Sequence, residues 1–129
     1  MKRKLILHVP HLSDSIPIRD GFLVDSSTLE KEILKLTDWY TDDLFYSDED
    51  EMIVAPFSRF FCDPERFEDD EHEVMAQFGM GVLYENSDAG EPIRTISKVL
   101  RERIMSEYYR KHHLDFKKVI KKKRPFDNL

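Results

Sequence analysis

Residues 4–17 read KLILHVPHLSDSIP, and this stretch predicts both the first strand of a sheet and a site at its end. The apolar run 4–9 is short and is stopped by Pro10, which is typical of a buried strand. His11 follows at the head of a polar loop, the place where open α/β sheets bind ligands. An imidazole there is either an ordinary loop residue or a metal ligand, and Asp14 adds a carboxylate within reach.

The rest of the chain predicts alternating helices and strands. A helix is expected to begin near Ser27, whose spacing to Glu30 gives a capping box. Two further apolar runs, 52–57 and 80–85, predict buried strands, and a long helix is expected from about Ile96 to Lys123. This order predicts an α/β fold with a mostly parallel sheet and a long C-terminal helix. On that helix we expect five core residues and two surface histidines, namely Val99, Leu100, Ile104, Tyr108 and Leu114 in the core and His112 and His113 at the surface.

Composition limits the class of protein. A chain of 129 residues, 40% hydrophobic and 36% charged, fits one folded domain. No apolar run approaches the roughly 20 residues of a membrane span, and the N-terminus lacks the features of a signal peptide. Cys62 is the one cysteine, so no internal disulfide can form, and a cytoplasmic location is expected. Nothing in the sequence around its thiol indicates activation as a nucleophile.

The charge is unevenly distributed. The net charge is −6, but the last 13 residues carry +5, which leaves −11 for the first 116. An acidic body argues against a nucleic-acid-binding protein, because polyanion binding needs a basic face. The Lys-rich end is interpreted as a solvated helix terminus. We therefore expect neither nucleic acid nor membrane as a partner.

Two polar segments could bind a ligand. The segment SRFFCDPER, 58–66, contains Arg59, Asp63 and Arg66. Guanidinium groups bind carboxylates in a fixed two-bond geometry, which suits an acidic substrate; pairing of Arg and Asp within the loop is the alternative. The segment TDWYTDDLF, 37–45, places Asp38 and Asp42 four residues apart on one face of a predicted helix end. Like charges at this spacing are mildly destabilising, so this helix end is either simply exposed to solvent or close to another group that offsets the negative charge.

Four segments, taken in order, resemble the N-formylglutamate amidohydrolase family: LILHVPHLSDSIP, LTDWYTDDLF, APFSRFFCDPERFEDDEHEVMAQFGMGVLY and IMSEYYRKHH. The resemblance spans Lys4 to about Ile120. It implies that residues 1–120 are the N-terminal part of an amidohydrolase-like α/β domain, and that 121–129 are a Lys-rich tail. The implied architecture is part of a three-layer phosphorylase/hydrolase-like sandwich, related to zinc carboxypeptidases and aspartoacylases.

The resemblance also implies an activity, a cofactor and roles for individual residues. It implies metal-dependent hydrolysis of the N-formyl amide of a small acidic amino acid such as glutamate, with a divalent metal, zinc in the first instance. By position, His11 corresponds to a metal ligand, and Asp38 to a ligand or a supporting carboxylate. The substrate-binding segment falls on Ser58, Arg59, Asp63 and Arg66. Glu65 departs from the Asn of many relatives, and no catalytic acid or base is assigned.

The chain is shorter than the relatives it resembles. They continue past the long helix into a strand with an Asp-x-His-Ser segment that carries a further metal ligand, which this sequence lacks. We therefore expect a truncated hydrolase that is inactive alone or that needs a second chain. The alternative is a non-catalytic module that self-associates into a homo-oligomer through an exposed sheet edge.

Overall fold

The computed structural model describes residues 6–39 and 51–123, and within them the sheet is parallel as predicted. Strand β1 (Ile6–Val9) pairs in parallel with β2 (Glu51–Val54), with Ile6 opposite Glu51 and Val9 opposite Val54. The helix α1 (Ser26–Leu36) lies between them in the chain, as a parallel pair requires a crossover connection.

The prediction of a third strand at residues 80–85 is wrong. Residues 80–84 are buried, but they form an irregular segment, and two 3₁₀ helices, η1 (Asp70–His72) and η2 (Val74–Phe78), precede it. Its backbone bonds to the loop after β2, since the Asp63 N–H donates to the Val82 carbonyl (2.8 Å). The two residues that flank the segment bond each other, because the Glu85 N–H donates to the Gly79 carbonyl (2.8 Å). A short apolar run signals burial without deciding the backbone conformation.

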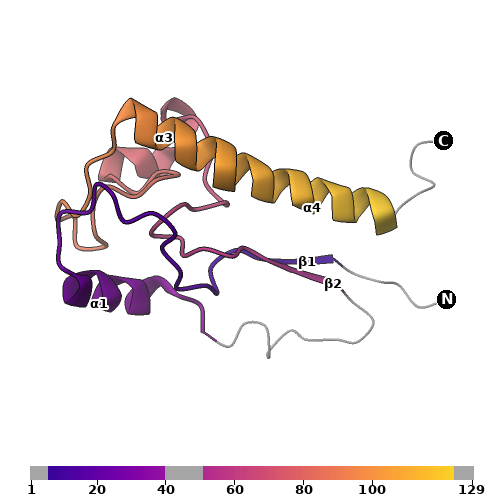
Figure 1. Cartoon of the computed structure of the whole chain (residues 1–129), viewed down its shortest axis with the longest axis horizontal. Helices are drawn as coiled ribbons and strands as arrows, with labels where there is room; N and C mark the ends of the chain where they lie inside the picture. Colours follow the sequence, from indigo (N-terminus) through magenta and orange to yellow (C-terminus); the bar gives the residue numbers. More distant parts are fainter. Residues whose placement is uncertain (1–5, 40–50, 124–129) are drawn as a thin grey trace.

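The long C-terminal helix is confirmed. Helix α3 (Lys98–Ile104), the π-helical turn η3 (Met105–Tyr109) and α4 (Arg110–Lys123) follow one another without interruption. Ser97 caps the start, because its hydroxyl accepts a hydrogen bond from the Leu100 N–H (3.1 Å). Figure 1 shows the helix running alongside both strands in the opposite direction. No helix in the described ranges is long and apolar enough to cross a membrane.

Helix α1 begins earlier than the capping pattern predicted, and it ends before Asp38, which was expected on the helix end. Asp25, not Ser27, is the N-cap, because its carboxylate accepts a hydrogen bond from the Thr28 N–H (2.8 Å). Aspartate caps a helix as well as serine does, so the sequence offered two neighbouring starts. The helix ends at Leu36, which places Asp38 in the loop that follows it; residues 40–50 lie outside the described part of the chain.

On the C-terminal helix, the residues that are buried differ in part from those predicted to lie in the core. Ile104 is fully buried as expected, whereas the side chains of Val99 and Leu114 are 80% and 54% exposed. At 100° per residue, Val99 lies about 140° around the helix from Ile104. Conversely, His112 was predicted at the surface and is only 5% exposed. Leu114, two residues further, points about 200° away from it.

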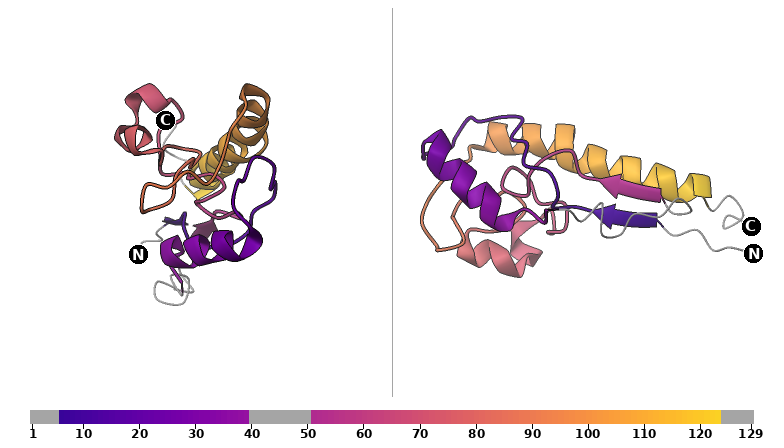
Figure 2. Two further views of the ribbon diagram at one scale, coloured as in Figure 1. Left: turned by 90° about the vertical axis from the view of Figure 1, so that its left-hand side faces the viewer. Right: turned by 90° about the horizontal axis from the view of Figure 1, so that it is seen from below.

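The core lies beyond the carboxyl ends of the strands. It is formed by α1, α3, the loop after β2 and the irregular segment 80–84. Four aromatic rings, those of Phe57, Phe60, Phe61 and Tyr84, are completely or almost completely buried in it. Figures 1 and 2 show α1 and the 3₁₀ helices gathered at this end, while the strands extend away from it along α4. Side chains that follow the strands are thereby carried into the best-packed part of the molecule.

We expect two leucines of α1 to differ sharply in their contribution to stability. Leu29 is 2% exposed and Leu34 is 62% exposed on the same helix. Leu29→Ala should lower the free energy of unfolding by about 2–5 kcal/mol, because it leaves a cavity in the core. Leu34→Ala, the matched control, should change it by less than about 0.5 kcal/mol. Urea denaturation followed by circular dichroism measures both, and equal effects would contradict the described orientation of α1.

Candidate functional site

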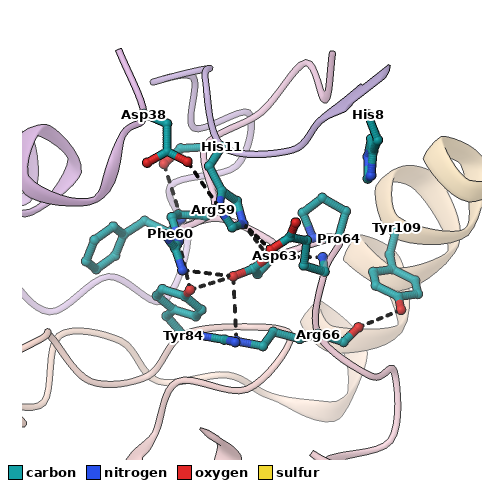
Figure 3. Close-up of polar contacts among 12 residues, drawn as sticks. His8, His11, Asp38, Arg59, Phe60, Asp63, Pro64, Arg66, Tyr84 and Tyr109 are labelled. Carbon is teal, nitrogen blue, oxygen red and sulfur yellow. Dashed lines mark hydrogen bonds and ion pairs between the residues drawn. The ribbon is translucent and has the colours of Figure 1, made fainter. Parts of the chain in front are cut away.

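A buried carboxylate, that of Asp63, gathers the polar side chains at the carboxyl ends of the strands (Figure 3). Its Oδ1 lies 2.8 Å from His11 Nε2, and its Oδ2 accepts a 2.6 Å hydrogen bond from the Tyr84 hydroxyl. Two guanidinium groups approach Oδ2 as ion pairs, Arg59 through Nη2 at 3.5 Å and Arg66 through Nε at 3.6 Å. We call these five residues the Asp63 cluster.

Backbone hydrogen bonds between loops position the cluster. His11 stands two residues after β1, and its carbonyl accepts from the Asp38 N–H (2.7 Å). The loop after β2 is fixed to the first loop, because the Ser58 N–H donates to the Ser15 carbonyl (2.7 Å). The irregular segment 80–84 supports it from the other side through the Val82 carbonyl.

Arg94 holds the loop from within the core. Its Nη1 donates to the carbonyls of Phe60 (3.1 Å) and Phe61 (2.8 Å), and its guanidinium lies 4.6 Å from the centroid of the Phe22 ring. Burial lowers the pKa of Arg94 to about 10, so the group stays charged at neutral pH. The backbone just before Asp63 is therefore fixed by a cation that takes no direct part in the cluster.

The protonation states in the cluster follow from its contacts. Burial alone would raise the pKa of Asp63, but hydrogen bonds from His11 and Tyr84 and the charges of His11 and Arg59 hold it below its usual range. Burial raises the pKa of the Tyr84 phenol, and the Asp63 charge raises it further. Asp63 is thus an ionised acceptor and Tyr84 a protonated donor. Of the two ring nitrogens of His11, Nε2 must carry hydrogen to bond Asp63.

When His11 is neutral, its other ring nitrogen, Nδ1, is an acceptor that faces a carboxylate. Nδ1 lies 3.7 Å from Asp38 Oδ2. Two acceptors facing each other at this distance suit a cation, because zinc binds nitrogen and carboxylate oxygen at about 2.0–2.2 Å each. A histidine that ligates a metal commonly donates its other N–H to a carboxylate, as His11 does to Asp63. His11 and Asp38 therefore fit two ligands of a divalent metal.

A complete metal site is not formed by the residues that the structure describes. Among residues 6–39 and 51–123, no group of three or more histidine, cysteine or carboxylate side chains has the geometry to hold a metal ion. Catalytic zinc sites generally have three protein ligands. The described residues thus offer His11 and Asp38 as a pair of candidate ligands.

Five of the six side chains predicted from sequence come together here: His11, Asp38, Arg59, Asp63 and Arg66. The sixth, Ser58, is 1% exposed, and its hydroxyl accepts from the Phe60 N–H (3.1 Å) within its own loop. The functional roles assigned to all six stay predictions. Pairing of Arg and Asp within the loop, the alternative considered from sequence, is present at both arginines.

The sequence did not point to Tyr84. It ends an apolar run that predicted a strand, and it is 21 residues away from Asp63 in the chain. Its hydroxyl also accepts from Arg59 Nε (3.0 Å), so it joins a guanidinium to the central carboxylate.

Cys62 behaves as predicted for an inactive thiol, because it is buried and burial raises its pKa. Glu65 is half exposed, with Oε2 3.8 Å from His11 Nε2.

Comparisons with known proteins give one family. The family described as N-formylglutamate amidohydrolase matches residues 3–127. A crystal structure of N-formylglutamate amidohydrolase from Ralstonia eutropha JMP134 superposes with a TM-score of 0.79 at 20% sequence identity. The match covers 96% of this chain and 50% of that chain, so the sequence spans half the length of this relative. No curated protein matches the sequence at a significant level.

We expect the Tyr84 hydroxyl to stabilise the cluster. Tyr84→Phe leaves Asp63 without its shortest hydrogen bond and Arg59 Nε without its acceptor. Since hydrogen bonds to charged groups contribute about 1.5–3 kcal/mol, the free energy of unfolding should fall by about 2–3 kcal/mol.

Tyr108→Phe is the matched control. The Tyr108 ring packs edge-on against Phe57 and Phe61, and no hydrogen bond of its hydroxyl is found within the described ranges. Its removal should change the free energy of unfolding by less than about 0.5 kcal/mol. If urea denaturation gave the same loss for both variants, the Tyr84–Asp63 bond would have no special weight.

Proposed function

Because the chain belongs to the N-formylglutamate amidohydrolase family, we propose that it takes part in metal-dependent hydrolysis of the N-formyl amide of an acidic amino acid. The observation that carries the proposal is the convergence of His11, Arg59 and Arg66 on the buried Asp63 carboxylate, with Asp38 facing the other nitrogen of His11. Potential ligands for a cation and potential binders of an anion meet there, and such a substrate needs both.

In this proposal His11 and Asp38 hold the metal, with zinc as the first ion to test. A bound divalent metal would polarise the formyl oxygen and lower the pKa of bound water. Asp63 acts through other residues, because it is fully buried: it keeps hydrogen on His11 Nε2, so that Nδ1 faces Asp38. The supporting carboxylate thus sets the direction in which the imidazole binds.

Arg59 and Arg66 are proposed to bind the carboxylates of the substrate. Two guanidinium groups approach the single carboxylate of Asp63, and the more exposed Asp38 and Glu65 add two carboxylates around His11. Arg66 Nε is buried and has no hydrogen-bond partner in the described structure, although it lies 3.6 Å from Asp63. Holding a carboxylate at a fixed distance from the metal ligands would orient the scissile amide. Ser58 would keep the shape of the loop that carries both arginines.

The fold similarity supports a larger architecture for the complete active unit. The solved relative is twice as long as the matched part, and parallel sheets are usually covered on both faces. We propose that the two described strands belong to a three-layer sandwich whose remaining strands complete the metal site.

A paired measurement of metal binding and deformylation tests the function. We expect the protein to bind about one equivalent of Zn²⁺ in equilibrium dialysis, and His11→Gln to lower the affinity at least tenfold by removing a ligand. His72→Gln is the control, because the His72 side chain is 75% exposed and forms an ion pair with Asp69, away from the Asp63 cluster. Formate release from N-formyl-L-glutamate is measured on the same samples.

The two readouts separate three ways in which the proposal could fail. Equal zinc affinity in wild type, H11Q and H72Q would reject His11 as a ligand. Zinc binding that depends on His11 without formate release above the buffer rate would reject independent catalysis by this chain while leaving the metal pair in place. Formate release that survives H11Q would overturn the proposed mechanism.

A second candidate function is that of a self-associating module without catalysis. It is favoured by the small sheet: the described residues contribute two parallel strands, and Val54 at the end of β2 is 39% exposed. Unpaired strand edges promote association between chains. Size-exclusion chromatography with light scattering should then give a mass of at least two chains, and Val54→Lys should shift it to that of one. A monomer at all concentrations tested would reject this candidate.

A further inference from the structure

Two histidines from opposite ends of the chain meet outside the Asp63 cluster. His8 lies in β1 and His112 in α4, 104 residues apart, and their Nε2 atoms are 2.8 Å from each other. The rings stack with centroids 5.0 Å apart, and the His8 ring also packs at 4.9 Å against Phe116, one helical turn further along α4. This pair joins the strand to the middle of the long helix.

The chemistry of the contact limits how many protons the pair can hold. A hydrogen bond between two imidazole Nε2 atoms needs hydrogen on one and a lone pair on the other. A pair carrying one extra proton still satisfies this condition. When both rings are protonated, both Nε2 atoms are donors, and two positive charges meet at hydrogen-bonding distance in a site where His112 is only 5% exposed.

We propose that His8 and His112 form a proton-sensitive latch, which holds α4 against β1 while at least one ring is neutral and opens when both are protonated. The latch does not depend on the proposed hydrolase activity. Its consequence reaches the candidate site, because β1 leads within three residues to His11. On the helix side, the neighbouring His113 Nε2 lies 2.9 Å from the carbonyl of Pro64, the residue after Asp63.

The charged groups around the pair include some that lower and some that raise the histidine pKa values. On the His8 side, burial lowers the pKa, the charges of His113 and His11 lower it further, and Glu65 from the loop after β2 raises it. On the α4 side, burial and the charges of His8, His113 and Lys111 lower the pKa of His112 to about 4, against the opposing effect of Asp115.

The direction of the pH dependence follows. Because these folded-state pKa values lie below the ordinary value for histidine of about 6.5, the latch is fully stabilising above that pH. Its stabilisation is lost as the pH falls from about 6.5 toward 4. The two groups should titrate as one coupled pair.

The test is a pH titration of the full chain, from 8 to 4, followed by NMR of the histidine Cε1–Hε1 groups. We expect the His8 and His112 signals to move in two linked steps. At the second step the nuclear Overhauser effects between His8 and Phe116 should disappear, while those between Phe60 and Tyr84 in the core persist. His72→Gln, at the exposed histidine of η1, should leave this profile unchanged.

A substitution at the pair distinguishes a latch from general acid unfolding. His8→Gln provides an uncharged acceptor for protonated His112, so contacts between residue 8 and Phe116 should persist at least one pH unit lower than in wild type. His112→Gln provides the reciprocal test if the first variant folds poorly. Single independent titrations near 6.5 would overturn the latch. So would loss of the Phe116 contacts at the same pH in wild type and both variants, or their loss only together with the core contacts.

Discussion

A carboxylate with no exposed surface must be compensated by hydrogen bonds and opposite charge, and at Asp63 this requirement organises the whole loop-rich end of the molecule. An imidazole, a phenol and two guanidinium groups converge on its two oxygens from three separate parts of the chain. Each of these groups is oriented by the same anion. The cluster is thus a structural unit as well as a candidate site, and neither aspect can be altered without the other.

The site is built on loops, yet the core makes these loops rigid. Two of the best-buried aromatic residues, Phe60 and Phe61, directly precede Cys62 and Asp63, and Arg94 holds their carbonyls from inside. The Nε and Nη2 atoms of Arg94 have no hydrogen-bond partner in the described structure, so its charge is offset by carbonyl oxygens and by two aromatic faces. Burying a guanidinium with two unpartnered nitrogens costs free energy, and the bonds from Nη1 to the carbonyls of Phe60 and Phe61 offset part of that cost while they fix the polar loop.

The chain matches 50% of the solved relative. Its described residues include two candidate metal ligands, His11 and Asp38, and both candidate anion-binding arginines. The histidine latch, formed by His8 and His112, lies where β1 and α4 meet. The described residues therefore contain the Asp63 cluster at the candidate site and a histidine pair that joins β1 to α4.

The sequence by itself determined the family, the parallel α/β pairing, the long C-terminal helix and five of the side chains at the site. These features depend on local patterns: an apolar run stopped by proline, a helical period, and motifs in a fixed order. It could not show that residues 80–84 are irregular, or that Tyr84 bonds Asp63, because an apolar run signals burial without naming its partners. The burial of His112 likewise depends on His8, 104 residues away. Only the tertiary structure decided which polar groups meet, since hydrogen bonds between distant segments leave no periodic trace in either one.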